Sequence, residues 1–297
     1  MDHKQPHQDK VFIGIFFGVL AFFGFAVMSM GAKLLSDTHS VFEISFYRCL
    51  ITLVPMGAYV LWSKRYALIS VYNKKLVFLR VILGILAVLS TFGTAKYLPL
   101  ADATLLFMMA TLITPAFAFF ALSERMGWRR WVAVCVGLIG VSLILQPSGE
   151  LQILGTALGI FSACMHSTAQ VLLRTLKRES SFALTFYFVL GGIILLAPFM
   201  PSKAIGFDNL NDIAILMLVG ISGGLGQYCL ARAFTLAPAS SVSPFAYSGL
   251  IWAVIFDIAI WSVIPGYPVF IGAAIIVGAK LYILHREHAL QKKANTT

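Results

Sequence analysis

Apolar segments of roughly twenty residues recur along almost the whole chain, separated by short polar stretches. A segment of that length crosses the hydrocarbon core of a bilayer as an α-helix. We place ten such segments at residues 11–35, 41–62, 76–97, 102–122, 131–146, 152–174, 182–200, 213–236, 239–262 and 267–284. Only 11% of the 297 residues are charged, against about 25% in an ordinary soluble domain. The sequence therefore predicts an all-α integral membrane protein with ten transmembrane helices.

The positive charges indicate how the chain crosses the membrane. Most of the 22 Lys and Arg residues fall on one side, Arg80 counted among them, whereas Lys203 is the single one in a loop on the other side. Because cytoplasmic loops are enriched in Lys and Arg, both termini are expected in the cytoplasm. The net charge of +10 then reflects topology, and no nucleic-acid partner is expected.

Three motifs of the first half of the chain recur in the second half in the same order. Gly14-x-x-x-Gly18 returns as Gly155-x-x-x-Gly159, and the Phe-Tyr pair at 46–47 returns at 186–187. The segment 95–104, which ends the third span, returns as 231–240 at the end of the eighth. The chain is thus divided into an N-terminal tail (1–10), a first five-helix repeat (11–146), a second five-helix repeat (152–284) and a C-terminal tail (285–297).

Each repeat has an odd number of spans, and this number determines how the second repeat is oriented in the membrane. The second copy enters the membrane from the opposite side, so the sequence predicts two inverted repeats around a central cavity, the architecture of many secondary transporters. The GxxxG pairs are interpreted as helix packing sites. The Ser-Gly-Gly-Leu-Gly run at 222–226 is interpreted as close packing or, alternatively, as a hinge, and it does not match a nucleotide-binding loop.

Ionisable side chains inside spans are costly and are therefore candidates for function. Lys33 lies near the outer end of the first span and either reaches the headgroups or serves the site. Glu43 and Arg48 are five residues apart, a poor spacing for a pair on one helix. Arg48 must face the bundle interior, either as a substrate or gate contact or as a structural hydrogen-bond centre.

Other polar residues in spans fall into pairs. Lys96 and Arg232 occupy equivalent places in the two repeats and suit helix ends, and Tyr228 shares a helix face with Arg232. His166 and Gln170 are one turn apart in the middle of the sixth span. They are either a site or hydrogen-bonded core residues.

Asp257 is the most unusual residue, because apolar residues surround it inside the ninth span. It is either protonated, which makes it a proton-coupling candidate, or paired with a cation such as Lys280. Tyr247 and Trp252 are candidates for an aromatic wall or for packing, and Gln227 completes the set of substrate-binding or gating candidates.

Several segments together resemble the ten-helix EamA type of drug/metabolite transporter. These segments are Phe-Tyr-Arg-Cys-Leu at 46–50, Tyr-Leu-Pro-Leu-Ala-Asp-Ala-Thr at 97–104, Leu-Ser-Glu-Arg-Met-Gly-Trp-Arg-Arg-Trp at 122–131 and Tyr-Ser-Gly-Leu-Ile-Trp-Ala-Val at 247–254. The resemblance implies secondary transport across a bacterial cytoplasmic membrane by facilitation, exchange or proton coupling. It also implies a helix-end structural or gating role for Glu124. Val263 departs from the pattern, since an acidic residue is usual after the ninth span.

Charges associated with the spans lean positive, which favours a small organic substrate with an anionic group held by Arg48 or Lys33. The alternative is a zwitterionic or cationic metabolite, such as an amino acid or S-adenosylmethionine, met by Glu43 or Asp257. The resemblance implies that the family includes transporters of such compounds.

A membrane enzyme and a membrane sensor are less favoured than a transporter. His166 is the one His in a span core, and Cys49, Cys135, Cys164 and Cys229 lie singly in spans, so no catalytic residue, metal site or cofactor is expected. A sensor has no need of an inverted repeat. The expected partners are the substrate and the lipid bilayer, and the expected state is a monomer or weak homodimer.

Overall fold

The computed structural model describes residues 5–122, 128, 131–132, 135–136, 150–176, 179–200, 210–236, 243–267, 270–275 and 278. Every regular element in these ranges is helical. The α-helices are α1 (Gln5–Leu35), α2 (Val41–Ser63), α3 (Lys74–Tyr97), α4 (Leu100–Leu122), α6 (Glu150–Thr175), α7 (Ser181–Leu196), α8 (Leu210–Leu236) and α10 (Ser248–Trp261). Short 3-10 turns are η1 (Tyr66–Ile69), η2 (Ala197–Phe199) and η3 (Ser243–Tyr247).

The predicted spans agree with these helices where the two can be compared. Five helical segments in the described ranges are long and apolar enough to cross a membrane, namely Phe12–Leu35, Val41–Ser63, Lys74–Tyr97, Phe182–Phe199 and Leu210–Leu230. The predicted fifth span, 131–146, and tenth span, 267–284, lie largely outside the described residues. The all-α prediction is confirmed in that part of the chain, whereas the count of ten stays a prediction.

The ninth span differs from its prediction in where its α-helix begins. The α-helix starts at Ser248, after the 3-10 turn η3 that contains Pro244. Proline has no amide hydrogen and its ring clashes with the preceding turn of an α-helix. The regular helix therefore begins only after this residue.

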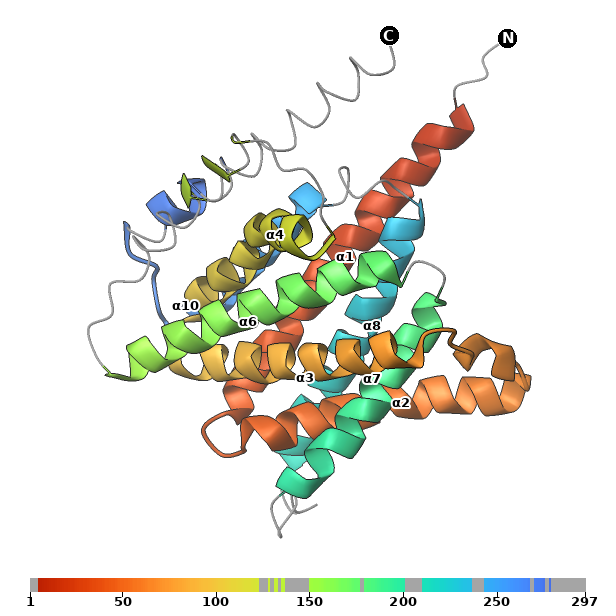
Figure 1. Ribbon diagram of the computed structural model, residues 1–297. Helices are drawn as coiled ribbons and strands as arrows, with labels where there is room; N and C mark the ends of the chain where they lie inside the picture. The colour runs from red at the N-terminus through yellow and green to blue at the C-terminus, as the bar shows by residue number, and fades with distance from the viewer. Residues whose placement is uncertain are drawn as a thin grey trace, which may run out of the picture.

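Helices of one repeat pack mainly against helices of the other repeat. The most extensive contacts join α1 to α8 and α3 to α6, and both pairs run side by side in Figure 1. Gly24 approaches Gly226 while Gly31 approaches Val219, so α1 and α8 are antiparallel. The core therefore lies between the two repeats rather than within each one.

Helices α2 and α7, which are equivalent in the two repeats, also pack against one another. Phe42 stacks on Phe199 near one end of the pair, and Tyr59 meets Phe182 near the other. The two helices are therefore antiparallel, the orientation that an inverted repeat requires.

Glycines allow the closest of these approaches. A Cβ atom on Gly24 would lie 3.0 Å from the carbonyl oxygen of Ser222 and 3.3 Å from the Cα of Gly226. In the 222–226 run, Gly223, Gly224 and Gly226 contact side chains of α1 and α2, and α8 continues through the run without a break. The packing interpretation of this run is confirmed, and the hinge stays a prediction.

A carboxylate supports the helix end at the α2–α3 connection. Glu179, which lies between α6 and α7, accepts hydrogen bonds from the backbone amides of Tyr72 and Asn73 at 3.0 and 2.8 Å. The Asn73 side chain in turn caps α3 by accepting from the amide of Leu76 at 3.2 Å. Amides at a helix start have no partner within the helix, so the α6–α7 connection of the second repeat stabilises the start of α3.

The contrast between two glycines tests the close packing of α1 on α8. Gly24→Leu should lower the free energy of unfolding by about 1–3 kcal/mol, because its side chain would have to enter the space of the α8 backbone. Gly57→Leu is the matched control, since nothing lies within 4 Å of a Cβ at that position. Thermal unfolding in detergent should give a lower Tm for Gly24→Leu only. Equal Tm values for both variants would contradict the close approach.

Candidate functional site

Arg48 lies inside the helix bundle, as its position in the second span predicts. It is the eighth residue of α2 and only 3% exposed. Its Nε donates to the sulfur of Met28 at 3.1 Å, and its guanidinium carbon lies 5.8 Å from the ring centre of Phe188 on α7. Its Nη1 is buried and has no hydrogen-bond partner in the described part of the chain. A thioether is a weak acceptor, so this cation is poorly satisfied by the protein.

Helix α8 has no side chain at the place where the Arg48 guanidinium lies, because Gly223 occupies that position. A Cβ atom on Gly223 would lie 3.0 Å from Nε of Arg48. One turn further along α2, the Thr52 hydroxyl donates to the carbonyl of Gly220 on α8 at 3.2 Å, which holds the two helices together beside the guanidinium. Gly223, within the glycine run at 222–226, thus forms part of the wall around Arg48.

Arg80 is a second guanidinium inside the bundle: the residue is half-buried and lies within α3, whereas the sequence analysis counted it among the charges outside the spans. It is the seventh residue of α3, and its guanidinium carbon lies 5.4 Å from the ring centre of Phe188. Its Nε and Nη1 are buried without a hydrogen-bond partner among the residues that the structure describes. One turn along α3, Gly84 makes room for the Phe188 ring, since a Cβ there would lie 2.7 Å from Cε2 of Phe188. The side chain turns inward because this face of α3 packs on α7.

His166 and Gln170 lie on α6 among polar side chains of α3 and α4. His166 Nε2 is 3.3 Å from the Thr91 hydroxyl, and its ring meets the Phe107 ring edge-on at 4.8 Å. The Thr114 hydroxyl donates to Gln170 at 3.5 Å. His166 and Gln170 are thus half-buried and hydrogen-bonded to side chains of α3 and α4, and their role as site residues stays a prediction.

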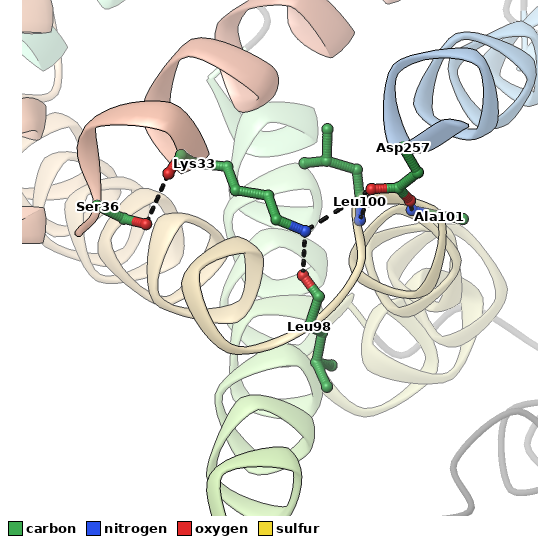
Figure 2. A network of polar contacts seen from close by, with 6 residues as sticks. All are labelled: Lys33, Ser36, Leu98, Leu100, Ala101 and Asp257. Atoms are coloured by element: carbon green, nitrogen blue, oxygen red, sulfur yellow. Dashed lines mark hydrogen bonds and ion pairs between the residues drawn. The ribbon is translucent and has the colours of Figure 1, made fainter. Parts of the chain in front are cut away.

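Asp257 is completely buried and holds the start of α4. Its two carboxylate oxygens accept from the backbone amides of Leu100 and Ala101 at 3.0 and 2.8 Å (Figure 2). These amides begin a helix, where donors lack internal partners and the helix dipole favours a negative charge. An Asp on α10, in the second repeat, thus stabilises a helix of the first repeat.

Lys33 is the cation beside Asp257. Its Nζ lies 3.7 Å from Oδ1 of Asp257 and donates to the carbonyl of Leu98 at 2.9 Å, as Figure 2 shows. The same Nζ lies 4.7 Å from the ring centre of Trp261. Lys33 therefore points into the protein rather than to the headgroups. The predicted partner, Lys280, lies outside the described residues, so the pairing alternative holds for Asp257 with a different lysine.

His39 joins two carboxylates at the same end of the bundle. Its Nδ1 lies 3.3 Å from Glu43, and its Nε2 lies 2.9 Å from Asp212 at the start of α8. Glu43 could be recognised as a candidate from the sequence, whereas His39 and Asp212 could not, because both lie at or beyond the ends of spans. The expectation that Glu43 is a poor partner for Arg48 agrees with this contact.

The remaining candidates do not lie together with Arg48. Lys96 is exposed in the last turn of α3, and Arg232 and Tyr228 are exposed on α8. Gln227 is half-buried, Trp252 packs on the Phe23 ring at 4.8 Å, and Tyr247 packs against the cluster around Leu98. Glu124 lies outside the described residues. In the described ranges, no group of three or more His, Cys, Asp or Glu side chains is placed to hold a metal ion.

Known transporters match the chain over most of its length. An uncharacterized transporter of Helicobacter pylori is 31% identical, and the match covers 93% of this chain and 96% of the relative. A pseudopaline exporter of Pseudomonas aeruginosa is 28% identical over 90% and 94% of the two chains. An S-adenosylmethionine uptake transporter of Rickettsia bellii is 26% identical over 95% and 97%.

The fold and the family model agree with these relatives. A solved crystal structure of a protein shares the fold with a TM-score of 0.63, at 17% identity, over 92% of this chain and 96% of the other. The model of the EamA-like transporter family matches residues 12–146 and again residues 153–284, which are the two predicted repeats. This multi-pass integral membrane protein with two EamA repeats belongs to the EamA-like transporter family.

Proposed function

We propose that the protein is a secondary, alternating-access transporter of a small organic metabolite that carries an anionic group. In this proposal ten spans form two inverted repeats around a central cavity in a bacterial cytoplasmic membrane, with both termini in the cytoplasm. The antiparallel packing of α2 on α7 and the contacts between repeats support the inversion. Lys96 and Glu124 are assigned to helix ends.

The buried Arg48 guanidinium is the observation that carries the proposal. An uncompensated charge inside a protein costs several kcal/mol, whereas a contact with an aromatic ring returns about 0.5–2 kcal/mol. Phe188 and the Met28 sulfur therefore offset only part of the cost. An anionic group on the substrate would supply the missing partner, since the planar guanidinium matches a carboxylate with two parallel hydrogen bonds.

The alternative substrate is a zwitterionic or cationic metabolite. The pseudopaline exporter and the S-adenosylmethionine uptake transporter among the relatives keep this alternative open. The two acidic residues that would bind such a substrate already have other contacts in the structure. Glu43 contacts His39, and Asp257 holds the start of α4. This engagement favours the anionic substrate. The relatives include an exporter and an uptake transporter, so the proposal concerns the substrate and not the direction.

Asp257 has two possible roles in transport. It is the proton-coupling candidate, and it is also the clamp that joins α10 to the α3–α4 turn. Both oxygens accept from amides, and Lys33 lies nearby, which suits a charged carboxylate. We therefore favour the clamp.

Transport by purified protein in liposomes tests the substrate class. Wild-type protein should take up at least one compound from a panel of labelled organic acids, and Arg48→Met should raise the half-saturating concentration about ten- to a hundredfold. Loss of a hydrogen bond to a charged group costs about 1.5–3 kcal/mol, which corresponds to that range. Arg65→Gln is the control, because Arg65 is exposed beyond α2. Uptake of cationic or zwitterionic compounds alone would overturn the proposal.

The Asp257→Asn variant separates the clamp from proton coupling. The amide nitrogen would face a backbone N–H donor, so the clamp role predicts a lower Tm and reduced uptake with or without a pH gradient. A proton carrier predicts something different, namely uptake that persists but no longer responds to the gradient. Uptake driven by imposed pH gradients, measured together with Tm, distinguishes the two, and the second result would contradict the clamp.

A further inference from the structure

The guanidinium groups of Arg48 and Arg80 converge on one ring from opposite ends of the bundle. Arg48 lies in the second turn of α2, on the end that holds Leu35 and Leu98, and Arg80 lies in the second turn of α3, on the opposite end. Phe188 is the eighth of the sixteen residues of α7 and lies within 6 Å of both groups. The two cations therefore meet near the middle of the membrane-spanning region, where α2 and α3 contact α7.

Neither cation has an acidic partner in the part of the chain that the structure describes. The nearby buried carboxylates are used elsewhere. Glu43 contacts His39, Glu179 holds the amides of Tyr72 and Asn73, and Asp257 holds the start of α4. Three guanidinium nitrogens, Nη1 of Arg48 and Nε and Nη1 of Arg80, are buried without a hydrogen-bond partner there.

The two charges together need more than one negative charge. Two cations that face the same ring repel one another, and each bears its own cost of desolvation. The electron-rich face of the Phe188 ring attracts each of the two cations only weakly, by about 0.5–2 kcal/mol for each contact. A substrate with one acidic group would leave one guanidinium uncompensated. A substrate with two acidic groups would satisfy both.

This inference rests on the proposed function: we propose that Arg80 is a second anion-binding residue and that the substrate is an organic anion with two acidic groups. One acidic group contacts Arg48, the other contacts Arg80, and the apolar part of the molecule packs against Phe188. The close approach of Gly84 to Phe188 and of Gly223 to Arg48 keeps the ring and the guanidinium group in place. The acidic groups are carboxylates or phosphates, because the guanidinium fork matches both.

Matched pairs of acids provide the test. Succinate and butyrate, and glutarate and valerate, share a chain length and differ by one carboxylate, and 3-phosphoglycerate and glycerate differ by one phosphate. Wild-type protein in liposomes should take up the compound with two acidic groups from at least one pair with a half-saturating concentration at least tenfold below that of its partner, the monoanion. Which pair shows the preference identifies the second acidic group as carboxylate or phosphate.

The Arg80→Met variant should abolish the preference within the pair while it retains uptake of the monoanion through Arg48. Arg80→Lys should restore part of the preference, and Arg65→Gln should leave it unchanged. The ligand-free Tm provides a second readout. Because Arg80 has unpaired N–H groups, Arg80→Met should unfold no earlier than wild type, whereas a structural hydrogen-bond centre would unfold earlier.

Three outcomes overturn the inference. They are equal half-saturating concentrations within every pair, an unchanged preference in Arg80→Met, and a marked fall in its ligand-free Tm. Uptake of monoanions that depends on Arg48 would survive these results, so the proposed function would stand. No uptake of any organic anion by wild-type protein would overturn the proposed function itself.

Discussion

Backbone amides and carbonyls at helix ends must find partners inside the protein, because lipid supplies none. The turn between α3 and α4 shows how this chain meets that constraint. Asp257 accepts from the first amides of α4, and Lys33 donates to the carbonyl of Leu98 at the end of α3. Since Lys33 comes from α1 and Asp257 from α10, one ion pair fixes a turn of the first repeat to helices of both repeats.

Glu179 performs a related task at the opposite end. From the α6–α7 connection of the second repeat, it holds the amides that precede α3. Helix α3 is thus anchored at both ends by charged residues from other parts of the chain. The two buried guanidinium groups lie between these anchors, on the side where α3 meets α7. The polar groups in the described core are therefore of two kinds, those that satisfy helix ends and those that remain unsatisfied around Phe188.

The spans, the two repeats and the family could be predicted from the sequence because their signals are local. The length of an apolar segment and the repetition of a motif can be recognised without knowing which residues pack against them. Arg48, Lys33 and Asp257 were each flagged for the same reason, since a charge inside an apolar segment is conspicuous. Their contacts could not be predicted, because Lys33 meets Asp257 only through the packing of α1 and α10 on the α3–α4 turn. Arg80 was counted among the charges outside the spans because it lies near the edge of its span, where a reading of hydropathy cannot separate loop from helix. His39 and Asp212 carried no signal of their own.

The positions of the two arginines also bear on how the chain enters the membrane. Arg48 lies about 10 Å from the start of α2, and Arg80 about 9 Å from the start of α3, at 1.5 Å for each residue. During insertion, before the helices assemble, each long side chain can extend to the nearer headgroup layer and remain hydrated. Only when α2, α3 and α7 assemble do the two guanidinium groups turn toward Phe188. The cost of placing two positive charges in the middle of the bundle therefore arises when the helices assemble, not when each span inserts. Helices that insert one by one can in this way build a site that would be unfavourable in lipid.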